Sequence, residues 1–70
     1  MIRVTVNGEP RQLEAEATVA SVIASQPGVP ASGRGVAVAV AGEVIPRGAW
    51  ADTQLRDGAQ VELVVAVQGG

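Results

Sequence analysis

The 70-residue chain contains no cysteine and no histidine. Disulfide bonds are therefore excluded, and so are the zinc sites that thiolate and imidazole ligands usually form. Phe and Tyr are also absent, and Trp50 is the only aromatic residue. A domain of this size buries only roughly 60% of the surface of its unfolded chain. Its stability must therefore come from a compact core of aliphatic side chains, or from a partner.

Lysine is missing as well, and the five arginines are scattered along a chain whose net charge is −2. Nucleic-acid binding normally requires a basic patch, often with stacking aromatic residues, so we exclude that class. No apolar run approaches the roughly 20 residues that span a bilayer, and no charged segment followed by a hydrophobic one opens the chain. We expect a soluble cytoplasmic protein that binds neither nucleic acid nor membrane.

The N-terminal segment predicts a β-hairpin. Apolar and polar residues alternate over 2–6, as in a half-buried strand. Asn7-Gly8 follows, and this pair favours a type I′ turn, which needs positive φ at both central residues. The return strand is expected at about 11–15. Pro10 at its start has no N–H to donate, which suits an edge strand.

A change of periodicity after this hairpin predicts one short helix. Val19, Val22 and Ile23 are spaced to share one helical face. Thr18 is a plausible N-cap, because its hydroxyl can accept from an N–H of the first turn. The helix should end before Pro27, since the residue before a proline avoids the α region.

The second half of the chain predicts three more strands, over 36–40, 43–46 and 60 to about 66 or 67. Residues 47–52 are expected to form an irregular or 3₁₀ turn, and Leu55 to enter the core from a loop. On the last strand Val61, Leu63 and Val65 should point inward, whereas Glu62, Val64 and Ala66 should point outward.

The expected order is therefore β-β-α-β-β-β, an α+β fold with a mixed five-stranded sheet and one helix packed on one face. The last strand can lie in the middle of the sheet, parallel to the first. This is the β-grasp, or ubiquitin-like, architecture, and we expect it over residues 1–66. A small five-stranded barrel is the alternative. Residues 67–70 are then left as a flexible C-terminal tail.

The body offers weak candidates for a site, and we expect no catalytic residue and no metal site. Glu14 and Glu16 could form a carboxylate pair, but a solvated charged edge is the favoured interpretation. Trp50 is interpreted as a core residue rather than a ligand platform. The glycines of 33–35 open a strand and not a helix, so this segment is interpreted as a loop and not a phosphate site. Pro46-Arg47 could either contact a partner or end a strand.

The tail, Val67-Gln68-Gly69-Gly70, is the strongest candidate. Four residues reach roughly 13 Å when fully extended. Two glycines without Cβ atoms form a thread that can enter a narrow channel of a partner, and they leave the terminal carbonyl unhindered. The carboxylate of Gly70 is a poor electrophile until adenylation converts it to a mixed anhydride. We therefore expect Gly70 to be the modified residue.

Residues 36–50 (VAVAVAGEVIPRGAW) and 55–70 (LRDGAQVELVVAVQGG) resemble the ThiS family of bacterial sulfur carrier proteins of thiamine biosynthesis. One departure is Ala41-Gly42, where the family often has Asn-Gly. The resemblance implies that an E1-like adenylyltransferase, using ATP and magnesium, activates Gly70. A sulfur donor protein then supplies sulfur to form a Gly70 thiocarboxylate, and thiazole synthase takes that sulfur. The carrier itself is then no enzyme and binds no cofactor.

Docking to such partners requires a surface on the body. If one sheet face lies under the helix, the other exposes Ala39, Val64 and Ala66 beside Thr5 and Glu62, and we expect partners to bind there. Three other functions stay open at this point. They are a molybdopterin-synthase small subunit, a sulfur carrier of another pathway, and a ubiquitin-like interaction domain with an inert tail.

Overall fold

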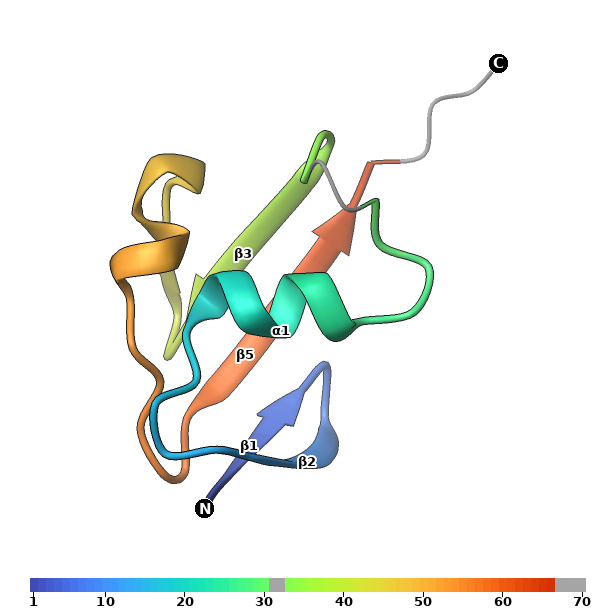
Figure 1. Cartoon of the computed structure of the whole chain (residues 1–70). Helices are drawn as coiled ribbons and strands as arrows, with labels where there is room; N and C mark the ends of the chain where they lie inside the picture. The colour runs from blue at the N-terminus through green and yellow to red at the C-terminus, as the bar shows by residue number, and fades with distance from the viewer. Residues whose placement is uncertain (31–32, 67–70) are drawn as a thin grey trace.

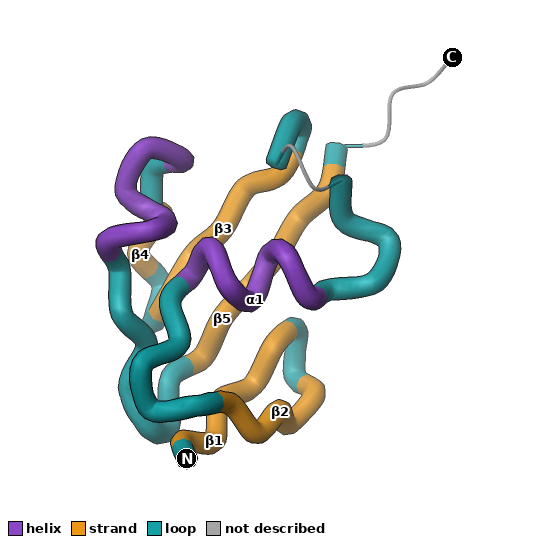
Figure 2. The backbone as a smooth tube through the Cα atoms, in the orientation of Figure 1, coloured by secondary structure: helices purple, strands orange, loops and turns teal. Residues whose placement is uncertain are grey.

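The computed structural model of the chain describes residues 1–30 and 33–66. Figures 1 and 2 show the elements, which follow the predicted order with a 3₁₀ helix, η1, before the last strand. They are β1 (Ile2–Val6), β2 (Glu9–Leu13), α1 (Val19–Ser25), β3 (Val36–Val40), β4 (Glu43–Val44), η1 (Arg47–Asp52) and β5 (Gln60–Val65). Among these residues no helix is long and apolar enough to cross a membrane.

The strands form one mixed five-stranded sheet in the order β2-β1-β5-β3-β4. The central strand β5 runs parallel to β1 and antiparallel to β3, and α1 lies across one face (Figure 1). This is the predicted β-grasp fold. The alternative of a closed barrel is wrong, because β2 and β4 remain as edges. Pro10 lies in β2, so its missing N–H falls on an edge strand as expected.

Two turns of the same geometry build the two hairpins of the sheet. Asn7 and Gly8 have φ values of 52° and 83°, and Ala41 and Gly42 have values of 52° and 82°. Both pairs are therefore type I′ turns, although alanine replaces the asparagine in the second. Asn7 also ties its hairpin to β5, since its Oδ1 accepts from the Leu63 N–H at 2.8 Å and its Nδ2 donates to the Leu63 carbonyl at 3.2 Å.

The helix α1 begins and ends where local chemistry predicts. The Thr18 hydroxyl accepts from the Ser21 N–H at 3.2 Å, and the Ser21 hydroxyl accepts from the Thr18 N–H at 2.9 Å. This reciprocal pair is a capping box with serine as its second member. Gln26 is extended, with ψ of 123°, because Pro27 follows it.

The core lies between α1 and the covered face of the sheet, and Trp50 and Leu55 close its side. Trp50 is 7% exposed and Leu55 is 3% exposed, so both predictions of core packing are confirmed. The indole N–H of Trp50 donates to the Ile45 carbonyl at 2.9 Å, which satisfies the only polar group of that side chain. The other buried core residues are Val4, Val6, Val19, Val22, Ile23, Val38, Val61 and Leu63.

Three strand boundaries differ from the predictions. The return strand β2 spans Glu9–Leu13 and not 11–15, because a two-residue turn lets pairing resume at once. The strand β4 ends at Val44 instead of reaching Pro46, although the Ile45 N–H still donates to the Val38 carbonyl. The last strand β5 ends at Val65, one or two residues before the predicted end at 66 or 67.

Candidate functional site

The sheet face opposite α1 gathers side chains from its three adjacent strands β5, β3 and β4. In the strand register, Glu62 lies opposite Ala39 and Val64 lies opposite Ala37. Ala39 in turn lies opposite Val44 of β4. The predicted face residues Ala39, Glu62 and Val64 therefore lie side by side, as strand alternation requires.

Aliphatic side chains dominate this face, and we refer to Ala37, Ala39, Val44 and Val64 as the open-face patch. Val64 is 64% exposed and Val44 is 71% exposed, whereas buried core valines are nearly inaccessible. Ala37 is exposed and Ala39 is half-buried. A contiguous exposed apolar patch is typical of a surface that binds another protein. Two polar neighbours, Thr5 and Glu62, lie on the same face.

Sequence reasoning missed Val44 as a member of this patch. The Ala41-Gly42 turn leaves two residues between the strands, and it therefore pairs Val40 with Glu43 and Ala39 with Val44. Since residues directly opposite each other share a face, the turn alone could have placed Val44 beside Ala39.

A backbone hydrogen bond of Ala66 continues the pairing beyond the end of β5. The Ala66 N–H donates to the Gly35 carbonyl with 2.6 Å between nitrogen and oxygen, so pairing with the segment before β3 extends past Val65. Ala66 is exposed. The predicted tail, Val67 to Gly70, lies outside the described residues.

The described part of the body contains no cluster of side chains arranged for acid–base chemistry or metal binding. Within residues 1–30 and 33–66, no group of three or more His, Cys, Asp or Glu side chains could hold a metal ion, and no polar side chain is buried. Glu14 and Glu16 are both exposed, which fits a solvated edge better than a desolvated pair. The segment 33–35 is a loop, with φ of 73° at Gly33 and 72° at Gly35.

A β-grasp body with an apolar open face beside the end of its central strand defines the chain as a ubiquitin-like protein. The ThiS family model matches residues 4–70, and the chain therefore belongs to the ThiS family. The crystal structure of the thiamine biosynthesis protein ThiS from Geobacter metallireducens is 30% identical and superposes with a TM-score of 0.79. That match covers 99% of this chain and 100% of the other. No curated protein matches the sequence.

This membership confirms the resemblance seen in the sequence. It assigns the chain to the small ubiquitin-like sulfur carriers of thiamine biosynthesis.

Proposed function

We propose that the carboxylate of Gly70 is adenylated and converted to a thiocarboxylate, whose sulfur is donated for thiazole formation. The extent of the family match supports this, because it runs through Gly70, whereas the last buried core residue of the described part is Leu63. In this proposal the final residues are left available for chemistry that a partner performs.

The proposed chemistry takes place at the terminal carboxyl group of Gly70. A carboxylate oxygen of Gly70 attacks the α-phosphorus of ATP, and pyrophosphate leaves. A sulfur nucleophile from a donor protein then attacks the carbonyl carbon and displaces AMP. If that nucleophile is a persulfide, a thiol cleaves its S–S bond and leaves the thiocarboxylate. ATP and magnesium belong to the E1-like adenylyltransferase, and the carrier itself binds no cofactor.

The residues of the tail suit this task. Gly69 and Gly70 have no side chains, so the terminal carbonyl is open to attack from either side. Four residues beyond Ala66 reach roughly 13 Å when extended, which is enough to pass through a short channel. A thiocarboxylate sulfur is anionic and nucleophilic at neutral pH, as the donation to thiazole synthase requires.

The open-face patch is the docking surface in this proposal. Its valines would be covered by the adenylyltransferase and later by thiazole synthase, and burial of apolar area is the main driving force of such association. Ala66 continues the surface toward the tail. Glu62, beside Ala39, supplies a charge that fixes the orientation of the partner. The proposal places the complete cycle in the cytoplasm.

Intact-protein mass spectrometry tests the proposal. The protein is incubated with the adenylyltransferase of its host, ATP, magnesium and a sulfide source. We expect a mass gain equal to the difference between sulfur and oxygen. Deletion of Gly70 should abolish this gain and leave the melting temperature nearly unchanged. An unchanged mass, with an enzyme shown to be active, would instead indicate an inert ubiquitin-like domain.

Complementation tests the pathway. The gene should restore growth of a thiazole-requiring strain that lacks its own carrier, and the Gly70 deletion should not. Rescue of a molybdopterin-requiring strain alone would assign the same tail chemistry to another pathway.

A further inference from the structure

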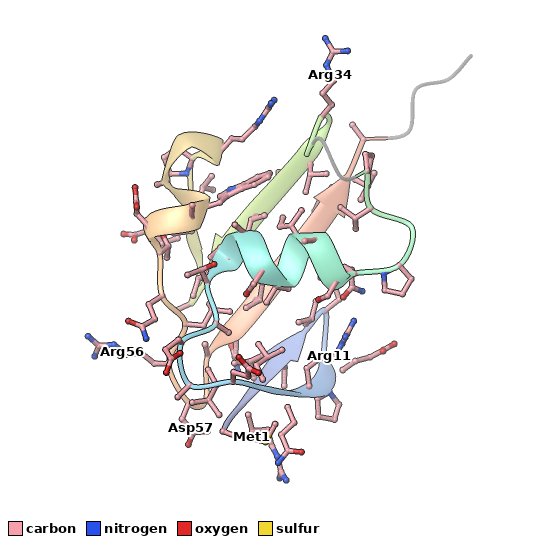
Figure 3. The ribbon with its side chains drawn as sticks, in the orientation of Figure 1. Met1, Arg11, Arg34, Arg56 and Asp57 are labelled. Carbon is pink, nitrogen blue, oxygen red and sulfur yellow. The ribbon has the colours of Figure 1, made fainter. Side chains whose placement is uncertain are left out.

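A groove of about 570 Å³ lies at the end of the sheet where β3 begins and β5 ends. Figure 3 shows Arg34 at this end, with its side chain directed away from the body. The groove is lined by Pro30, Arg34, Gly35, Arg47, Val65 and Ala66. It therefore lies at the base of the tail, beside the last residue that the structure describes.

The groove is cationic in a protein that is acidic as a whole. The chain has seven acidic residues and five arginines. Two of those arginines, Arg34 and Arg47, line the groove, and among the described residues that line it none carries a side-chain carboxylate. Both arginines are exposed. A local field of opposite sign to the net charge favours an anionic group at this position.

The two arginines come from separate segments, and Trp50 positions both segments. A Cβ atom added at Gly33 would lie 2.6 Å from Cζ3 of Trp50, so Gly33, which directly precedes Arg34, rests on the buried indole. On the other side, the indole N–H donates to the carbonyl of Ile45, two residues before Arg47. One rigid ring thus holds both segments that carry the guanidinium groups.

We propose that this groove receives acidic side chains of the adenylyltransferase, and that Arg34 and Arg47 bind them as the tail enters that enzyme. This inference rests on the proposed function. The anion is assigned to the enzyme and not to the adenylate, because Gly70 can lie roughly 13 Å from Ala66 when the tail is extended. Guanidinium groups match carboxylates in geometry and charge. Contacts at the base of the tail would set the direction in which it enters the channel.

Charge reversal tests the proposal. The dissociation constant of the adenylyltransferase complex is measured for the unaltered protein, for Arg34→Glu, for Arg47→Glu and for the double variant. Arg56→Glu is the matched control, because Figure 3 places Arg56 at the opposite end of the body. We expect about tenfold weaker binding for each single variant and about 100-fold for the double one, with the control within about twofold. Arg47→Gln should lose less than Arg47→Glu.

Two further readouts complete the test. Raising the salt concentration should slow association of the unaltered protein more than that of the double variant, because rim charges act mainly on the association rate. Equal melting temperatures and equal Trp50 fluorescence show that the variants are folded.

The possible results are distinct. Binding that is weakened equally by all three single reversals, or by none, would overturn the inference. Tighter binding by the Arg34 and Arg47 variants would also overturn it, and would indicate that the groove holds the chain's own terminal carboxylate. Failure of the unaltered protein to bind or be adenylated would instead defeat the proposed function, and the inference with it.

Discussion

The two faces of one sheet carry different tasks, although both are made of small aliphatic residues. On β5, Val61 is 1% exposed and Leu63 is 8% exposed, whereas Val64, the next residue, is 64% exposed. The covered face excludes water under α1 and supplies stability. The open face keeps its valines in water and is suited to binding another protein. The side of the sheet, and not the residue type, determines what a valine contributes.

The largest expected effect comes from making the same valine-to-alanine substitution on each of the two faces. Val61→Ala should lower the free energy of unfolding by about 2–3 kcal/mol, because it leaves a cavity in the core. Val64→Ala should change it by less than about 0.5 kcal/mol, since the side chain is already exposed. Urea denaturation with a common slope measures both. Equal losses at the two positions would contradict the division between the faces.

A charge introduced on the open face should weaken binding to the partner and leave the stability of the protein nearly unchanged. Val64→Asp should weaken binding to the adenylyltransferase about tenfold, because a carboxylate would be buried against an apolar partner surface. The melting temperature should change little. Ala15→Asp, in an exposed turn, adds the same charge away from the open-face patch and serves as the control. Indistinguishable affinities of the two variants would argue against docking through this face.

The smallest effect concerns the turn that brings Val44 to the open face. Ala41 has φ of 52°, a left-handed conformation that asparagine adopts more readily than alanine. Ala41→Asn should therefore raise the free energy of unfolding by about 0.5–1 kcal/mol, as thermal denaturation can measure. Binding should stay the same, because the register of β4 is unchanged. A lower stability would show that alanine is not strained at this position.

Local patterns in the sequence predicted much of this fold. Strand alternation, the Asn7-Gly8 turn and the Thr18 cap each depend on neighbouring residues, and the structure has all three. The open-face residues of β3 and β5 followed from alternation alone. The ends of β2, β4 and β5 were less predictable, because pairing across the sheet decides where a strand stops.

The cationic groove was beyond the reach of local patterns. Arg34 and Arg47 are thirteen positions apart and lie in segments that no periodicity relates. They line one groove because the ring of Trp50 contacts both segments from the core. Trp50 was correctly predicted to pack in the core. The segments that Trp50 contacts in the core depend on tertiary structure, and no periodic pattern in the sequence specifies them.

The most direct test of the account is to locate the modification on the chain. After reaction with the adenylyltransferase, ATP, magnesium and sulfide, the protein is fragmented in the mass spectrometer. If Gly70 is the modified residue, every fragment containing Gly70 gains the mass difference between sulfur and oxygen, and no fragment lacking Gly70 does. A gain on fragments of the body, or none on the terminal fragment of a fully reacted sample, would contradict it.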